Sequence, residues 1–162
     1  MGRYLTIEEL KPIVEEERQK GKTVVFGNGF FDLLHVGHVR YLKGAKDLGD
    51  ILIVAINDDA SVLTLGKRRS VITPLAERAE IVASICHVDY VVAFGEPTVE
   101  RLLLELKPHI HAKGTDYTPE TVPEGHVVRS YGGRVAIVGD PKEHSTTNII
   151  KAIKGTRSAG TT

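Results

Sequence analysis

The sequence predicts an α/β fold: one domain with an open, mostly parallel, five-stranded sheet and helices on both faces. Short apolar or β-branched runs alternate along the chain with longer segments of helical periodicity, a pattern typical of parallel sheets with right-handed helical crossovers. Residues 51–56 are apolar throughout, as expected for a strand buried on both faces. A chain of 162 residues has the length of one such domain.

The first helix and the first strand are marked by their end signals. Thr6 followed by Glu9 is typical of a capping box, which predicts a helix over about residues 7–20 that ends at Gly21. The β-branched and aromatic residues 23–26 then predict the first strand.

The remaining elements continue the alternation. Residues 57–59 follow the second strand with polar side chains that cap a short helix, and residues 66–70 predict a basic loop. We expect, in order, a helix from Pro74, a strand at 90–94, a helix at about 98–106, strands at 108–112 and 135–138, and a last helix from Ser145. The domain is expected to span residues 1–154, followed by a small, polar, disordered tail at 155–162.

The overall charge argues against polyanionic partners. Lys and Arg total 21 and Asp and Glu total 21, so we expect no nucleic-acid partner and no membrane partner, whereas a small anionic ligand needs only local basic residues. No apolar run approaches the ~20 residues of a membrane span, and the first residues lack a signal-peptide core. The lone Cys86 excludes an intramolecular disulfide. We therefore expect a cytoplasmic location.

The most informative stretch is the turn that follows the first strand. Gly27 and Gly29 carry no Cβ, which lets backbone N–H groups approach a bound anion. His35 and His38 lie on one side of the start of the next helix, which is expected to end near residues 48–49. The dipole of that helix favours phosphate at its N-terminus. The turn therefore predicts a nucleoside triphosphate site.

A metal site is the main alternative for the histidine pair. Two histidines at this spacing also occur on protein surfaces and in metal sites. No third or fourth ligand with zinc-like spacing lies nearby in the sequence. We therefore favour phosphate binding and expect no metal held by the protein.

Other polar segments converge on the same edge of the sheet. In open parallel sheets, ligands bind beyond the carboxyl ends of the strands, where the loop at Asn57, Lys113 and the loop at Asp140 also lie. In the basic run 67–69, Arg69 is the preferred candidate to reach a leaving pyrophosphate, although such runs are usually solvated surface. Residues 145–147 open the last helix with hydroxyl and free backbone N–H groups, which serve as a helix cap or as a phosphate site.

Three motifs, at residues 35–38, 113–117 and 145–148, resemble in their sequence and their order those of the cytidylyltransferase-like nucleotidyltransferases. His35-Val36-Gly37-His38 is similar to their HxGH signature, and Ser145-Thr146-Thr147-Asn148 is similar to their second phosphate-binding motif. Lys113-Gly114-Thr115-Asp116-Tyr117 resembles the KGxDY segment of the bacterial heptose-1-phosphate adenylyltransferases, except that Thr115 replaces a more usual glycine. The resemblance runs from about residue 5 to residue 153 and implies a Rossmann-like nucleotidyltransferase domain.

The resemblance implies roles for particular residues. His35, His38 and Lys113 are expected to be catalytic, and Asp32 and Asp116 are expected to bind the acceptor. Nucleotide and phosphate binding is expected from a larger set: Asn28, Gly29, Phe30, Phe31, Arg69, Arg78, Ser145, Thr146 and Thr147. The implied substrates are ATP and a sugar 1-phosphate, with D-glycero-D-manno-heptose 1-phosphate expected. Mg²⁺ is expected mainly on the nucleotide phosphates, and the assembly is expected to be a homodimer.

Several residues also have structural interpretations. Asp32 can instead shape its turn, and Arg78 can be a solvated helix residue. His109 and His111 are interpreted as partly exposed histidines at a strand end, and Cys86 as a small buried side chain within a helix. Outside these, His144 directly precedes the last motif and is the isolated histidine best placed to touch a ligand.

Two other functions stay open from the sequence. A related transferase for glycerol 3-phosphate, flavin mononucleotide or phosphopantetheine shares the histidine signature. A non-catalytic nucleotide-binding module would use the same fold, although such a module has no need of the histidine pair. The base is not specified by side chains, because backbone groups at residues 137–141 are expected to recognise it.

Overall fold

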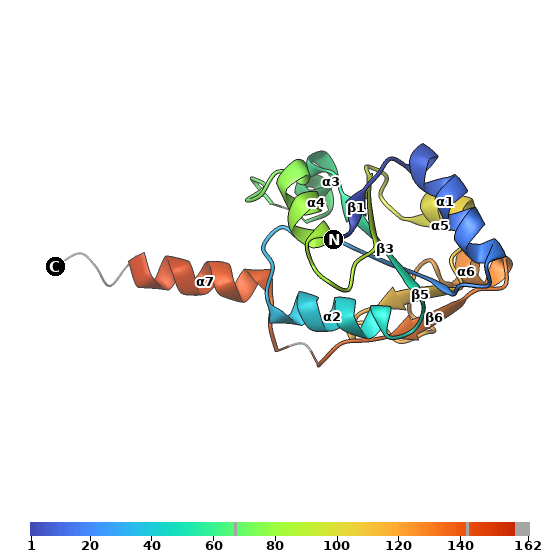
Figure 1. Ribbon diagram of the computed structural model, residues 1–162. Coiled ribbons are helices and arrows are strands. Elements are labelled where there is room, and N and C mark those ends of the chain that lie inside the picture. The colour runs from blue at the N-terminus through green and yellow to red at the C-terminus, as the bar shows by residue number, and fades with distance from the viewer. Residues whose placement is uncertain (67, 142, 158–162) are drawn as a thin grey trace.

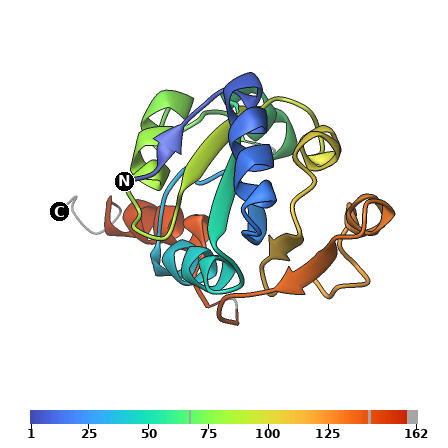
Figure 2. The same ribbon diagram turned by 45° about the vertical axis from the view of Figure 1, so that its right-hand side comes forward.

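One parallel sheet forms the centre of the computed structural model, which describes residues 1–66, 68–141 and 143–157 (Figure 1). The strands are β1 (Arg3–Tyr4), β2 (Val24–Gly29), β3 (Ile51–Asn57), β4 (Tyr90–Phe94), β5 (Ile110–Lys113) and β6 (Arg134–Ile137). Their order is β1-β4-β3-β2-β5-β6, and neighbouring strands are parallel. Figure 2 shows β1 and β6 at opposite edges. The predicted α/β class is confirmed.

The helices connect the strands and follow the last one. They are α1 (Ile7–Gln19), α2 (Val36–Lys46), α3 (Asp59–Leu65), α4 (Leu75–Ala83), α5 (Glu100–Leu106), α6 (Gly125–Ser130) and α7 (Thr146–Arg157). The predicted capping box opens α1, since the Thr6 N–H donates to Glu9 (2.8 Å) and the Glu9 N–H donates to Thr6 Oγ1 (3.3 Å). None of the described helices is long and apolar enough to cross a membrane.

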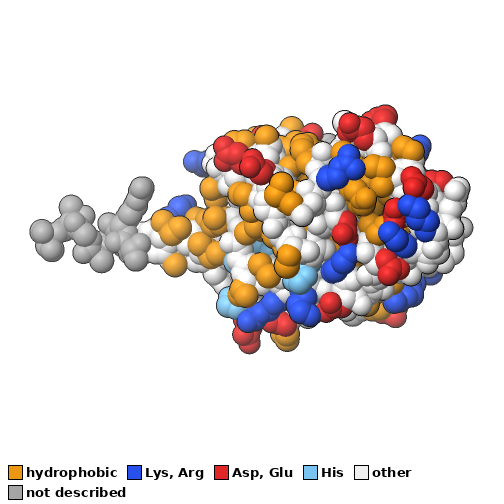
Figure 3. All heavy atoms as spheres, in the orientation of Figure 1, with side chains coloured by type: hydrophobic (Ala, Val, Ile, Leu, Met, Phe, Trp, Pro, Cys, Tyr) orange, Lys and Arg blue, Asp and Glu red, His pale blue; other side chains and the backbone are white. Residues whose placement is uncertain are grey.

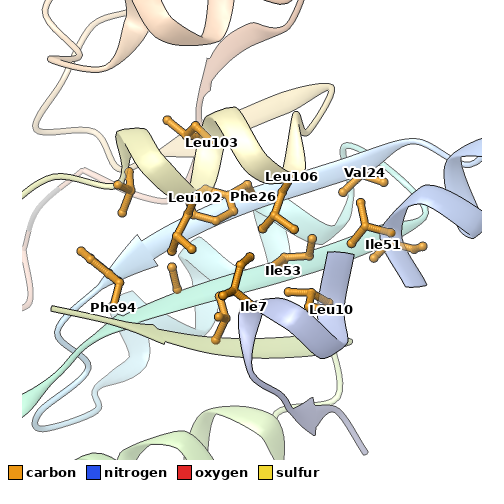
Figure 4. Close-up of a cluster of buried hydrophobic side chains, with 14 of the residues drawn as sticks. Ile7, Leu10, Val24, Phe26, Ile51, Ile53, Phe94, Leu102, Leu103 and Leu106 are labelled. Carbon is orange, nitrogen blue, oxygen red and sulfur yellow. The ribbon is translucent and has the colours of Figure 1, made fainter. Parts of the chain in front are cut away.

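Two hydrophobic layers cover the sheet, because alternate side chains of each strand point to opposite faces. α1, α5 and α6 cover one face, where Leu103 belongs to the same buried cluster as Phe26 (Figure 4). α2 and α4 cover the other face, where Leu42 clusters with Val54. All residues of β3 are buried, as its continuous apolar run predicted.

Four features differ from the prediction. The sheet has six strands instead of five, because β1 is a two-residue strand, too short to show a pattern, that pairs with β4. α6 was not predicted, and α7 continues to Arg157, so residues 155–157 are helical and not part of a tail. The other tail residues, 158–162, and Lys67 lie outside the described residues. Cys86 follows the end of α4 and is exposed, which corrects its interpretation as a buried helix residue.

The strand order creates a crevice at the carboxyl edge of the sheet. From β2 the chain adds β3 and β4 on one side, and it later adds β5 and β6 on the other side. The loops after β2 and β5 therefore leave the sheet in different directions, which is where open α/β sheets bind ligands. α7 begins beside this edge and then stands away from the body of the domain (Figure 1).

Candidate active site

His35 and His38 lie side by side at the start of α2, with ring centroids 3.9 Å apart. His35 Nδ1 accepts a hydrogen bond from the Gly37 N–H (3.2 Å), and His38 Nδ1 accepts one from the His35 N–H (3.2 Å). These bonds satisfy backbone donors that the first turn of a helix leaves without a partner. An imidazole whose Nδ1 accepts carries the proton of its neutral form on Nε2. Each neutral ring is thus a donor through Nε2.

His38 is neutral at physiological pH. Burial, followed by the charge of His35, lowers the pKa of His38 to about 4. The Phe31 ring lies 5.3 Å from the His38 ring and packs against it. Phe31 has a φ of 50°, in the left-handed region that bulky residues rarely adopt. Such strain persists where the surrounding structure holds the residue, so Phe31 contributes to the placement of His38.

The glycines of this turn make room for side chains. A Cβ on Gly27 would lie 2.5 Å from the Tyr41 hydroxyl oxygen, and a Cβ on Gly37 would lie 2.9 Å from the His35 ring. The Tyr41 hydroxyl donates to the Ala112 carbonyl (2.7 Å) and so joins α2 to β5. Packing therefore explains the glycine at position 27, for which the sequence suggested an anion-binding reason.

The start of α7 faces the histidine pair across a pocket of about 350 Å³. Ser145 Oγ caps the helix by accepting from the Asn148 N–H (3.1 Å), and Thr146 Oγ1 donates to the Leu33 carbonyl (3.0 Å). The pocket is lined by His35, His38, Ser145, Thr146 and Thr147, together with His144 and the segment 138–141. The structure thus brings together the two predicted phosphate motifs, which lie far apart in the sequence.

A second pocket of about 480 Å³ continues from the first beyond His38. Its lining includes six more of the residues predicted for the site: Asn28, Gly29, Phe30, Phe31, Lys113 and Asp116. Lys113 is buried, which lowers the pKa of its ammonium group, and its Nζ lies 4.7 Å from the centre of the Tyr117 ring. A buried cation at this position suits an anionic ligand.

Asp32 does not reach either pocket. Its buried carboxylate accepts hydrogen bonds from Arg68 Nη1 (2.7 Å), the Ile72 N–H (3.1 Å) and the Thr73 N–H (2.8 Å). Both carboxylate oxygens are used in fixing the loop that precedes α4. The expected acceptor contact is therefore wrong, and the turn-shaping alternative is closer to the observed role.

The basic residue that reaches the first pocket is Arg68 and not the predicted Arg69. Arg68 lines this pocket and forms an ion pair with Asp32 at 2.7 Å. Arg69 is exposed and does not line it. The run of basic residues signalled the loop correctly, but its conformation decides which side chain turns inward.

Arg78 has neither of its two predicted roles. Its side chain is fully buried, and the guanidinium donates to four oxygen atoms: the Thr73, Phe30 and Asn57 carbonyls and Asp59 Oδ1, at 2.6–2.8 Å. In this arrangement it is not solvated and has no surface for a phosphate. Arg78 instead joins the loops after β2 and β3 to the start of α4.

His111 is also fully buried, which corrects its interpretation as a partly exposed residue. Burial, followed by the charge of Lys113, lowers the pKa of His111 to about 3. Its Nε2 lies 3.1 Å from Asn28 Oδ1, so the neutral ring can donate there. His109 is exposed at the strand end, as predicted, and its Nδ1 accepts from the Val24 N–H (2.9 Å).

The family follows from comparison with known proteins. A family model described as cytidylyltransferase-like matches residues 26–156, which include the histidine pair and the start of α7. The chain belongs to the cytidylyltransferase-like family. This membership confirms the nucleotidyltransferase that the three sequence motifs predicted.

Curated relatives of this cytidylyltransferase-like chain carry the name "Bifunctional protein HldE". The relative from Syntrophotalea carbinolica is 52% identical over 147 residues, which cover 90% of this chain and 30% of the relative. The relative from Edwardsiella ictaluri is 43% identical over 150 residues, which cover 93% of this chain and 31% of the relative. The chain thus spans about a third of the length of these relatives.

Solved structures agree with the cytidylyltransferase-like fold. The lipopolysaccharide core biosynthesis protein from Thermoplasma volcanium is 26% identical with a TM-score of 0.64, covering 75% of this chain and all of that one. A pantoate-beta-alanine ligase from Francisella tularensis, crystallised with an ATP analogue and β-alanine, has a TM-score of 0.63 at 18% identity and covers 95% of this chain and 77% of that one. The ligase shows likeness of fold alone.

Sequence reasoning placed the Asn57 loop and the basic run with Arg68 at this crevice, but it named neither Asn57, Arg68 nor His111 as a site residue. Arg68 lines the first pocket, Asn57 lines the second, and His111 contacts Asn28 beneath it. The signal for Asn57 is that a polar residue ending a wholly apolar strand stands at the ligand-binding edge, which is why its loop was expected there. The burial of His111 left no such signal. Among the described residues, no group of three or more His, Cys, Asp or Glu side chains is arranged to hold a metal ion.

Proposed function

We propose that this chain transfers AMP from ATP to a sugar 1-phosphate, with D-glycero-D-manno-heptose 1-phosphate as the expected acceptor. The observation that carries the proposal is the histidine pair at the start of α2, which includes the neutral His38 and faces residues 145–147 across one pocket. Neutral imidazole donors and a helix N-terminus suit the charge of a triphosphate. A second pocket with a buried Lys113 adjoins His38 and leaves room for an anionic acceptor.

The proposed reaction needs positioning more than proton transfer. An acceptor phosphate oxygen attacks the α-phosphorus of ATP, a new P–O bond forms, and the bond to the β-phosphate oxygen breaks to release pyrophosphate. The acceptor phosphate is anionic at neutral pH, so no general base is required. His35 and His38 donate hydrogen bonds to the oxygens on which charge develops, and Lys113 draws the acceptor phosphate to them.

The donor set suits Mg²⁺ that arrives with the nucleotide. The first pocket contains few carboxylates, and Asp140, one of them, forms an ion pair with Arg40. Mg²⁺ keeps several water ligands and binds phosphate oxygens readily, so it would sit mainly on the triphosphate and neutralise part of its charge. The nucleotide with its Mg²⁺ would then be held by Ser145, Thr146 and Arg68.

The choice of acceptor rests on the relatives. The segment 113–117 resembles that of heptose-1-phosphate adenylyltransferases. Relatives named HldE and a solved lipopolysaccharide core biosynthesis protein point to the same pathway, ADP-heptose and lipopolysaccharide biosynthesis. Since the chain matches only part of those relatives, the substrate is a proposal for this chain, as is a cytoplasmic location.

The test is pyrophosphate release by the purified chain with a panel of nucleotides and acceptors. ATP with D-glycero-D-manno-heptose 1-phosphate is expected to give the highest kcat/KM, with a nucleotide-sugar as the second product. CTP with glycerol 3-phosphate would, if preferred, replace the proposed substrates. Nucleotide binding without pyrophosphate release for any acceptor would favour a non-catalytic module instead.

We also propose a homodimer in which α7 packs against a second copy. α7 carries the apolar residues Ile149, Ile150 and Ile153, and Ile153 is 55% exposed. Apolar side chains are visible where this helix leaves the body (Figure 3). Ile153→Asp is expected to convert a dimer to a monomer in light scattering, whereas a wild-type monomer would overturn the proposal.

A further inference from the structure

The crevice does not end at Lys113. A third pocket, of about 250 Å³, shares Asn28, Asn57, Lys113 and Tyr117 with the second pocket and adds Glu124. We call this third space the inner pocket. The shared lining residues show the order of the three pockets. His38 borders the first and second pockets, and Lys113 borders the second and the inner pocket. Of these three pockets, Glu124 borders only the inner one. The three residues therefore lie in that order along the crevice.

Two buried charged side chains line the inner pocket. Lys113 and Glu124 are only 9% and 6% exposed. The charge of Glu124 acts on Lys113 and partly offsets the effect of burial on the Lys113 pKa. No ion pair within 4.0 Å joins these two side chains in the described part of the chain. Buried charges are almost always paired, so this separation leaves space for a ligand between them.

Glu124 also has an unused hydrogen-bond acceptor. Its Oε2 is buried and has no hydrogen-bond partner among the described residues. A buried carboxylate oxygen in this condition is costly for the folded chain unless a ligand or a water donates to it. Glu124 lines the inner pocket together with Lys113, so a ligand hydroxyl group in this pocket would lie beside the Glu124 side chain.

Two asparagines, Asn28 and Asn57, also line this pocket. His111 holds Asn28 Oδ1 through Nε2 (3.1 Å), which leaves the Asn28 amide nitrogen as its remaining donor. Asn57 is buried at the end of β3, and its carbonyl is fixed by Arg78 (2.8 Å). These contacts fix the backbone or the side chain of each asparagine and leave amide groups for a polar ligand.

We propose that the inner pocket binds the hydroxyl groups of the phosphorylated acceptor and that Glu124 determines which acceptor fits. This inference rests on the proposed function. The carboxylate repels phosphate and accepts from hydroxyls, so the acceptor enters with its hydroxyl-bearing end toward Glu124 and its phosphate at Lys113, next to His38. Glu124 and Asn57 thereby replace Asp32 as acceptor-binding residues.

The test compares Glu124→Gln with Glu120→Gln, an exposed residue of the same segment. Removing a charged acceptor of hydroxyl hydrogen bonds is expected to raise KM for the sugar 1-phosphate about tenfold or more. KM for ATP is expected to change less than twofold, and Glu120→Gln is expected to behave as wild type. A melting curve for each variant checks that the chain is folded.

Direct binding separates this inference from the proposed function. Calorimetry with sugar 1-phosphates and with inorganic phosphate is expected to show that Glu124→Gln weakens only the sugar phosphates. Wild-type turnover with equal acceptor KM in the two variants would overturn the role of the inner pocket. Glu124-dependent sugar-phosphate binding without any turnover would support the pocket and overturn the proposed reaction, and the absence of both would overturn both.

Discussion

The two phosphate motifs of the first pocket are built differently. At the start of α2, both histidine Nδ1 atoms accept backbone hydrogen bonds, and the Phe31 ring packs against His38. At the start of α7, Thr146 Oγ1 makes one hydrogen bond to the Leu33 carbonyl, and most of the helix beyond it is exposed. The first motif is fixed by the core of the domain, whereas the second is joined to the loop after β2 by the Thr146 hydrogen bond and continues into a helix that projects from the body (Figure 1).

This difference suggests a division of labour. Groups that stabilise a transition state must be held in place before the reaction, which is the condition of His35 and His38. Groups that only hold the ground state tolerate some adjustment when the ligand arrives. We therefore expect changes at the start of α2 to lower kcat and changes at the start of α7 to raise KM for the nucleotide.

The largest effect is expected from His38→Ala. Loss of one preorganised donor to the transferring phosphoryl group should lower kcat by about 10²–10³-fold, while nucleotide binding changes much less. Steady-state pyrophosphate release, with nucleotide affinity from calorimetry, measures both quantities. His87→Ala, a change on the opposite edge of the sheet before β4, serves as the control and should retain wild-type kcat.

A second strong effect, on stability, is expected when Arg78, which joins the loops after β2 and β3 to the start of α4, is replaced. Arg78→Ala leaves the buried Asn57 carbonyl and the partly buried Phe30 and Thr73 carbonyls without the guanidinium. Buried acceptors without partners cost about 1–3 kcal/mol each, so the free energy of unfolding should fall by at least about 2 kcal/mol in urea titrations. The exposed Arg134→Ala is the matched control. An Arg78→Ala chain as stable as wild type would contradict the supporting role.

A smaller effect is expected at α7. Thr146→Val keeps the shape of the side chain and removes its hydrogen bond to the Leu33 carbonyl. A neutral hydrogen bond contributes about 0.5–1.5 kcal/mol, so KM for ATP should rise about two- to tenfold with little change in kcat. If kcat fell as far as it does in His38→Ala, the proposed division between the two motifs would be wrong.

The comparison also explains what could be predicted from the sequence. The strands and most helices follow from local periodicity, and the histidine pair follows from a turn after a buried strand, because both signals lie within short segments. The burial of Arg78 was not predicted, and two interpretations of Asp32 stayed open, because the roles of both depend on carbonyl and N–H groups of loops distant in the sequence. Arg69 was preferred over Arg68 because a run of basic residues does not specify which side chain turns inward.

The smallest effect is expected on the loss of stability in acid. It compares His38, at the start of α2, with His144, beside the start of α7. The folded state holds the pKa of His38 near 4, below its ordinary value of 6.5. Between these values the unfolded chain binds more protons, so the stability contributed by neutral His38 is complete above pH 6.5 and is lost as the pH falls toward 4. Buried His111 acts in the same direction down to about pH 3 and is present in every variant compared.

His38→Asn can place an acceptor near the position of Nδ1 without a group that protonates in this range. The drop in melting temperature between pH 7 and pH 5 should therefore be smaller in His38→Asn than in wild type. His144 lies on the α7 side of the pocket and is exposed, so His144→Asn should keep the wild-type drop. Equal drops in melting temperature in all three proteins would mean that His38 does not control the loss of stability in acid.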